Sequence, residues 1–184
     1  MYIEKSAQHK RQKGFTLIEL ITVVVIITTL FVIVLANYRS GQLKQAIVQA
    51  EKKLISDLRR AQNMAISGTS VNNQYYGYGI YMDIGSGGNN KSYIIYGEKE
   101  QGSQSYNQGV DVIIETIALP EKTIIQEVSS ANQKLGIFFE PPDPKTYIDS
   151  SPQSNQATII LRGENDASLT KTITVNNAGL IQGN

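Results

Sequence analysis

The stretch Lys10–Leu20 reads K-R-Q-K-G-F-T-L-I-E-L, and it opens an apolar run from Phe15 to Ala36 in which Glu19 is the one ionisable side chain. About 22 residues in a helix reach roughly 33 Å, and the hydrocarbon core of a bilayer is about 30 Å thick. We therefore predict a membrane-spanning helix over residues 15–36.

Basic residues gather on the N-terminal side of this run. Lys10, Arg11 and Lys13 precede it, whereas only Arg39 and Lys44 follow soon after it. Because basic flanks stay in the cytoplasm, the N-terminus is expected there, with a single membrane pass and the rest of the chain outside the cytoplasm. Ordinary secretory signals differ, since their apolar core is shorter and their small-residue cleavage site follows it.

The junction Gly14-Phe15-Thr16-Leu17-Ile18-Glu19 resembles the signature of the type IV pilin and type II secretion pseudopilin superfamily. That signature is a short basic leader, a glycine, a phenylalanine, and a glutamate at the fifth position after the cut. In the superfamily a membrane-embedded prepilin peptidase cuts after the glycine and methylates the new terminal amine. The resemblance implies a leader over residues 1–14, cleavage between Gly14 and Phe15, and N-methylation of Phe15.

Glu19 is the unusual residue in the predicted span. An acidic group inside a membrane helix costs about 2.5 to 3.5 kcal/mol on insertion scales, and such residues usually serve a function. The resemblance implies that Glu19 pairs with the terminal amine of a neighbouring subunit, with Leu17 and Ile18 in the same assembly contact. Alternatively, Glu19 extends to the cytoplasmic interface because it lies near the new terminus.

Composition argues against catalysis. The chain of 184 residues has no cysteine and one histidine, and that histidine, His9, lies in the expected leader. The commonest zinc sites and the Ser-His and Cys-His nucleophile pairs are therefore excluded from the mature chain. Asp111, Glu115 and Glu121 are interpreted as ordinary solvated surface. We expect a protein that is not an enzyme and that has no cofactor or metal.

Two local patterns superficially suggest ligand sites. The glycine-rich segment Gly85–Asn90 has no following Lys-Ser/Thr and does not open a helix, so it is not interpreted as a phosphate-binding loop. Asp83 beside it could help to hold a calcium ion, but one carboxylate is too few to predict a site.

Beyond the span, apolar residues recur every three or four positions and predict one buried stripe of an amphipathic helix over residues 37–67. This helix is expected to run to about Ile66, with Gly68 as its stop, and to carry polar residues such as Gln62 on its other side. The stripe contains Leu43, Ile47, Ala50, Leu54, Leu58, Ala61 and Ala65. Packing on the chain's own sheet is preferred over a coiled-coil partner, because the stripe is rich in alanine.

Residues 68–184 alternate between β-rich runs and turns, which predicts an exported β-rich globular domain. The long N-terminal helix packed on this antiparallel β-sheet domain gives an α+β fold. A proline-bounded loop from Pro141 to Pro152 is a candidate contact surface. The predicted strands are Gln74–Ile84, Ser92–Tyr96, Val110–Leu119, Thr123–Val128, Leu135–Phe139, Ala157–Arg162, Leu169–Val175 and Gly179–Gln182.

Finer features bear on the subfamily. Residues 57–65, D-L-R-R-A-Q-N-M-A, resemble a stretch of the H-type minor pseudopilins of type II secretion. Ala36 stands where many major type IV pilins have a proline, and the cysteine pair of major pilins is absent, so a major pilin is the less favoured alternative. A DNA-binding competence-type minor pilin would need a basic strip on the exported domain. The basic residues Lys52, Lys53, Arg59 and Arg60 lie instead on the helix.

The resemblance implies a filament subunit as the function. Its expected partners are the prepilin peptidase, other pilin or pseudopilin subunits, an inner-membrane assembly platform and the membrane itself, without DNA. The subunit would wait in the cytoplasmic (inner) membrane and then enter a type IV pilus-like or type II secretion filament. A plain anchored domain that never assembles fits the span but leaves the Gly-Phe-Glu pattern unexplained.

Overall fold

The computed structural model describes residues 14–68, 75–130, 132–141, 145–149 and 155–184, and for residues 36–40 it describes the backbone only. Most of the expected leader, residues 1–13, lies outside the described residues. So do Pro142, Pro144 and Pro152 of the candidate contact loop. The chain divides into two compact units, Met1–Ser40 and Gly41–Asn184, and each is treated below by itself.

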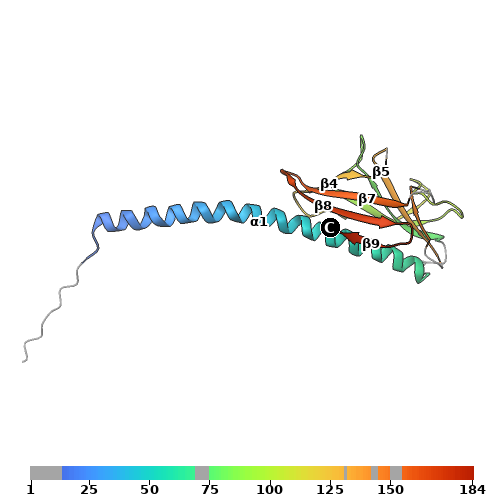
Figure 1. Cartoon of the computed structure of the whole chain (residues 1–184), viewed down its shortest axis with the longest axis horizontal. Helices are drawn as coiled ribbons and strands as arrows, with labels where there is room; N and C mark the ends of the chain where they lie inside the picture. The colour runs from blue at the N-terminus through green and yellow to red at the C-terminus, as the bar shows by residue number, and fades with distance from the viewer. Residues whose placement is uncertain (1–13, 69–74, 131, 142–144, 150–154) are drawn as a thin grey trace, which may run out of the picture. The chain divides into compact units, whose positions relative to one another are not determined.

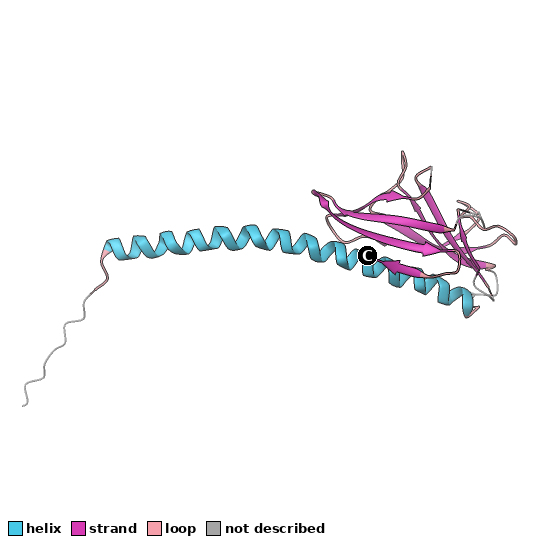
Figure 2. Ribbon diagram, in the orientation of Figure 1, coloured by secondary structure: helices cyan, strands magenta, loops and turns pink. Residues whose placement is uncertain are grey.

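The fold is α+β, as predicted. One helix, α1 (Leu17–Ile66), runs through both units, and all the described strands belong to the second unit (Figures 1 and 2). The strands are β1 (Gly77–Asp83), β2 (Ser92–Glu98), β3 (Val112–Ala118), β4 (Thr123–Val128), β5 (Lys134–Glu140), β6 (Lys145–Ile148), β7 (Gln156–Gly163), β8 (Asp166–Asn176) and β9 (Ile181–Gly183).

Helix α1 ends where the sequence predicts. Its last residue is Ile66, and Gly68 follows with a φ of 58°, a left-handed conformation that glycine adopts without steric cost. The amide of Ser67 donates to the carbonyl of Asn63, and the amide of Gly68 donates to that of Ala65. These bonds satisfy carbonyls that the helix end would otherwise leave unpaired.

Within the second unit, the predicted stripe of α1 is buried. Ala50, Leu54, Leu58, Ala61 and Ala65 are fully inaccessible to solvent. The expectation for Gln62 on the opposite, polar side was wrong. Its side chain is partly buried and its Nε2 donates to the carbonyl of Gly179, at 3.1 Å, so it fixes the turn before β9 against the helix.

The strands form two antiparallel sheets rather than the single sheet expected. One has the order β3-β2-β1-β5-β6 and the other the order β4-β7-β8-β9. All eight predicted strands are present; Thr123–Val128 has the predicted ends, and the other seven differ at one or both ends. β6 was missed because it lies in the proline-bounded loop, where the prolines suggested irregular chain. It pairs with β5, placing Ile148 opposite Ile137, and Ile148 is buried.

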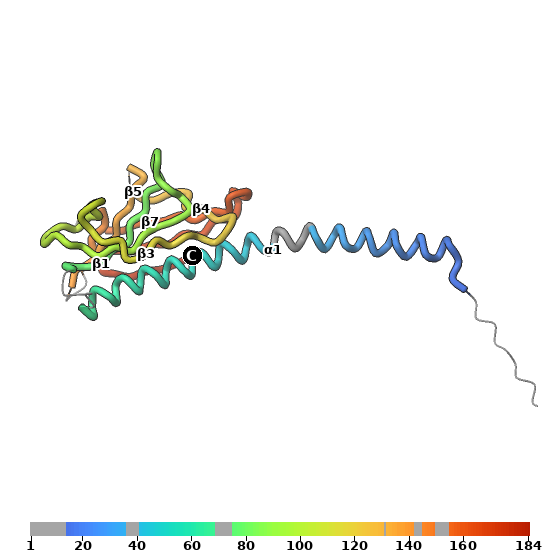
Figure 3. The backbone as a smooth tube through the Cα atoms, turned by 180° about the vertical axis from the view of Figure 1, so that it is seen from behind, coloured from blue at the N-terminus to red at the C-terminus, as the bar shows by residue number. Residues whose placement is uncertain are grey.

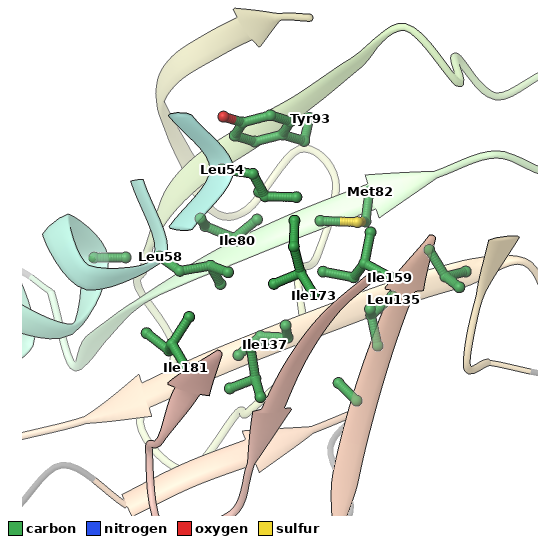
Figure 4. Close-up of a cluster of buried hydrophobic side chains, with 14 of the residues drawn as sticks. Leu54, Leu58, Ile80, Met82, Tyr93, Leu135, Ile137, Ile159, Ile173 and Ile181 are labelled. Carbon is green, nitrogen blue, oxygen red and sulfur yellow. The ribbon is translucent and has the colours of Figure 1, made fainter. Parts of the chain in front are cut away.

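One hydrophobic core joins both sheets to the second-unit part of α1. Figure 4 shows Leu54 and Leu58 of the helix facing side chains from β1, β2, β5, β7, β8 and β9. Burying a large aliphatic side chain contributes about 1.5 to 3 kcal/mol, and the chain has no disulfide to add to this. Apolar packing is therefore the main source of this unit's stability.

Polar contacts fix the second-unit part of α1 against its surroundings. The hydroxyl of Tyr93 in β2 donates to Asp57 Oδ2 at 2.7 Å, and both residues are buried. Arg60 makes an ion pair with Glu115 of β3, the strand that Figure 3 shows beside this part of the helix. On the other sheet, Lys171 of β8 approaches Glu51 at 3.4 Å. Together these contacts set the rotation of the helix on the core.

Gly79 of β1 leaves room for a buried aromatic ring. A Cβ at Gly79 would lie 2.6 Å from the ring of Tyr96, which is fully buried. We expect Gly79→Ala to lower the free energy of unfolding by about 1 to 3 kcal/mol, because the ring has no free space to move into. Chemical denaturation of the full chain in detergent, followed by tyrosine circular dichroism, measures this.

Gly136 of β5 provides the matched control, because a Cβ there would meet nothing within 4 Å. Gly136→Ala is expected to leave stability unchanged or to raise it slightly, since alanine loses less backbone entropy than glycine. Equal destabilisation by the two substitutions would show that the packing of Tyr96 over Gly79 is not the cause.

Candidate functional site

The candidate site is the start of α1, where Thr16 and Glu19 form reciprocal hydrogen bonds. The Glu19 amide donates to Thr16 Oγ1 at 3.3 Å, and the Thr16 amide donates to Glu19 Oε2 at 3.4 Å. This is the geometry of a capping box, in which an N-cap hydroxyl and an acidic side chain three residues later satisfy free helix amides. Leu17 is the first helical residue.

The sequence interpretation missed this capping role. The signal was present, because Thr16-Leu17-Ile18-Glu19 is the pattern Ser/Thr-x-x-Asp/Glu that precedes an apolar helix. The Glu19 carboxylate therefore has a partner within its own chain, next to the residue that would carry the new amine after cleavage. An acidic group at a helix N-terminus is also favoured by the helix dipole.

Gly14 and Phe15 precede the helix and are open to solvent. Neither residue has regular secondary structure, Phe15 is 88% exposed, and a Cβ at Gly14 would meet no atom within 4 Å. The peptide bond between them is thus accessible within its own unit.

The helix after this junction has the composition of a membrane span. Residues Leu17–Leu35 have a mean hydropathy of 2.9, and none of this segment is buried within the protein. The hydroxyls of Thr28 and Thr29 donate to the carbonyls of Val24 and Val25, which satisfies these donors inside the helix. Such a surface is stable only in lipid or against other apolar helices.

Residues 9–35 match the family model described as the prokaryotic N-terminal methylation motif. The N-terminal segment of this chain therefore carries a prokaryotic N-terminal methylation motif. The match covers the basic flank, the glycine–phenylalanine junction, Glu19 and the apolar helix.

Two solved structures are similar to this chain, both of the type IV minor pilin FimU from Pseudomonas aeruginosa in different crystal forms. Sequence identity is 15% in each case. The matches cover 74% of this chain and 86% or 90% of FimU, with TM-scores of 0.49 and 0.48. No curated protein sequence matches the chain.

The basic residues on the second-unit part of α1 are partly neutralised. Lys53 lies 3.6 Å and Arg60 3.9 Å from the Asp57 carboxylate, and Arg60 also pairs with Glu115. In the described residues, Lys52 and Arg59 have no acidic partner within ion-pair distance. These two positive charges form a basic patch smaller than nucleic-acid binding usually requires.

Acidic residues in the second unit do not assemble a metal site within the described ranges. Asp83 Oδ1 accepts the amide of Gly85 at 3.1 Å, and Asp83 Oδ2 lies 3.2 Å from Lys134 Nζ. The Asp83 carboxylate therefore organises the β1–β2 turn and neutralises a lysine.

The interpretation of Asp111 as solvated surface was wrong. Asp111 is 8% exposed, and its two carboxylate oxygens accept the amides of Lys99 and Asn107, which holds the loop between β2 and β3. Glu98 is fully buried, and Glu98 Oε2 has no hydrogen-bond partner among the described residues. Burial, together with the neighbouring Asp111 carboxylate, raises the pKa of Glu98 to about 7.

The raised pKa predicts that the folded domain is more stable in mild acid. A carboxyl whose pKa is higher in the folded than in the unfolded chain contributes stability that is complete below its unfolded value of 4.5 and lost as the pH rises through about 7. We expect the Tm to fall by about 3 to 6 °C between pH 5.5 and 8.5. Thermal unfolding followed by tyrosine circular dichroism measures it.

Glu98→Gln should remove this pH dependence and raise the Tm at pH 8.5, because the amide fills the same buried position without carrying a charge. Glu100→Gln is the control in the same loop, since Glu100 is exposed, and it should keep the dependence. A Tm that rises with pH in the native chain would contradict the assignment to Glu98.

Proposed function

We propose that the chain is a filament subunit, cleaved between Gly14 and Phe15, N-methylated on Phe15 and assembled through its N-terminal helix. Before assembly it is held in the cytoplasmic membrane by residues 15–36, with residues 68–184 exported and residues 37–67 continuing the helix. The prepilin peptidase, an inner-membrane assembly platform and other pilin or pseudopilin subunits are its partners.

The observation that carries this proposal is an apolar helix surface without any cover in its own unit, directly behind the methylation motif. In lipid that surface is already stable, so burial of apolar area alone gives no reason for helices to associate. A specific polar contact and close packing must supply the preference, and Leu17, Ile18 and Glu19 stand at the end of the helix where a new amine would appear.

Glu19 supplies that preference by pairing with the methylated amine of Phe15 on a neighbouring subunit. Inside an apolar bundle, an unpaired carboxylate and an unpaired ammonium are both costly, and each removes the cost of the other. Only one axial offset between two helices brings the groups together. The pair therefore acts as a register contact.

Two differences from the sequences of major pilins favour a minor subunit over a major pilin. Ala36 replaces the proline of many major pilins, and no cysteine pair closes a C-terminal loop. The resemblance of residues 57–65 to H-type minor pseudopilins points the same way. Such a subunit would start or cap a short filament of a type II secretion or type IV pilus-like machine.

Cysteine crosslinking tests assembly through the helix. Because the chain has no cysteine, Val24→Cys places a single thiol on the apolar surface, where Val24 is 55% exposed. Brief oxidation of living cells should give crosslinked products that include partner subunits carrying a thiol at the equivalent position. These products should require the active assembly ATPase.

A matched strain without the ATPase separates assembly from random collision in the membrane. Equal crosslinking with and without the ATPase would contradict the proposed assembly. So would the complete absence of products in cells whose filaments are visible.

A further inference from the structure

The outer side of the larger sheet carries two adjacent cavities that share Tyr81, Tyr106 and Lys134. Their volumes are about 400 and 320 Å³, within the range of about 300 to 1,000 Å³ for small-molecule sites. We call the pair the tyrosine groove. Its other lining residues include Asp83, Asn89, Ser92 and Gln108 in the first cavity and Ser105, Ser130, Asn132 and Asp149 in the second.

The one lysine in the tyrosine groove is paired with a carboxylate. Lys134 Nζ lies 3.2 Å from Asp83 Oδ2, and Asp149 Oδ1 accepts the amide of Gly136 at 3.0 Å. The backbone amide leaves the negative charge of Asp149 in place, so the groove offers no unpaired cation to an anionic ligand. Its electrostatics disfavour a negatively charged ligand.

Neutral hydrogen-bonding groups surround the tyrosines. Within the described residues, the side-chain amides of Gln108 and Asn132 and the hydroxyls of Ser92, Ser105 and Ser130 make no hydrogen bond to another part of the chain. Burial raises the pKa of both Tyr81 and Tyr106, so their hydroxyls remain protonated donors. Amides and hydroxyls both donate and accept, which matches the hydroxyl groups of a sugar.

Tyr106 is held in position before any ligand arrives. Its ring centroid lies 4.8 Å from that of Tyr81 and 5.2 Å from that of the buried Tyr96. The backbone amide of the next residue, Asn107, donates to Asp111 Oδ2 at 2.6 Å. A fixed aromatic ring among free polar groups reduces the ordering cost of binding.

We propose that the tyrosine groove binds a neutral oligosaccharide, with Tyr81 and Tyr106 as the aromatic surface and Gln108 and Asn132 as hydrogen-bonding partners. A sugar ring has an apolar face and a polar rim, and tyrosine presents the same combination of apolar ring and polar tip. The two cavities adjoin, so the ligand occupies both with neighbouring sugar units. This site lies outside the assembly helix and is independent of filament formation.

Titration calorimetry of the full chain in a zwitterionic detergent tests the proposal, because alkyl-glycoside detergents would compete for the groove. The probes are cello-, chito-, malto- and mannohexaose, with an acidic oligogalacturonate of similar length for comparison. At least one neutral hexasaccharide should bind saturably with little dependence on salt, and the acidic probe should bind more weakly.

Three variants locate the binding. Tyr106→Ala should weaken it about tenfold, and Gln108→Ala about threefold to tenfold through loss of a hydrogen bond. Gln101→Ala is the control, because Gln101 is exposed in the same loop but does not line either cavity. Circular dichroism melting shows whether each variant is folded, and Gln108→Ala keeps the test valid if Tyr106→Ala disturbs the loop.

Three results would overturn the proposal. The first is the absence of saturable binding by every neutral probe up to about 10 mM, which is weaker than ordinary specific recognition. The second is unchanged affinity in Gln108→Ala together with unchanged affinity in a folded Tyr106→Ala. The third is tighter, salt-sensitive binding of the acidic probe.

Discussion

Gly14→Val is expected to block removal of the leader and, with it, entry of the subunit into filaments. A Cβ at Gly14 would meet no atom of its own chain within 4 Å, so the substitution should not disturb the fold. The peptidase must bring its catalytic groups close to this peptide bond, and a branched side chain beside the bond obstructs that approach. We expect processing to fall by at least about tenfold, measured as the ratio of precursor to mature protein in membranes.

Gly41→Ala is the matched control for this experiment. A Cβ at Gly41 also meets nothing within 4 Å, and Gly41 lies inside α1, far along the chain from the junction. This variant should be processed like the native chain. Unimpaired processing of Gly14→Val would show that cleavage occurs at another bond.

Glu19→Ala is expected to leave membrane insertion intact and to reduce incorporation into filaments strongly. Removing an acidic group from the span lowers the insertion cost, by about 2.5 to 3.5 kcal/mol on insertion scales. The same change leaves the terminal amine of a neighbouring subunit without its partner. Fractionation of membranes and sheared filaments, with the variant as the only copy, measures both effects.

The capping box provides a second explanation for any defect, and further variants separate the two. Glu19→Gln can still accept the Thr16 amide but has no charge, whereas Thr16→Ala removes the other half of the box and keeps the carboxylate. Pairing with an amine predicts that Glu19→Gln fails like Glu19→Ala, while Thr16→Ala assembles. The reverse pattern would assign Glu19 to helix capping alone.

Much of the fold was predictable because its signals are periodic. The stripe containing Leu54 and Leu58 marked the buried side of α1, and the alternation of Tyr78, Ile80 and Met82 marked β1. Gly68 marked the helix end. These patterns are local, since helix and strand repeat every 3.6 and 2 residues whatever the partner.

What sequence did not predict depends on contacts between distant residues. Glu98 and Asp111 become a buried pair only because the β2–β3 loop returns to the sheet, and nothing in their spacing indicates burial. β6 is short and flanked by prolines, and its strand character comes from pairing with β5. The tyrosine groove likewise combines residues of β1, β2, β3 and β5 with residues of several loops. By contrast, the Thr16–Glu19 capping box is local, so attention to helix-start patterns could have found it.

Intact-mass measurement of the protein purified from native membranes decides whether the N-terminus is cut and methylated at Phe15. We expect a mass equal to residues 15–184 plus one methyl group, with the methyl located on the Phe15 amine by fragmentation. In cells without prepilin peptidase, the full precursor should appear instead. A full-length chain in cells with an active peptidase would contradict the account.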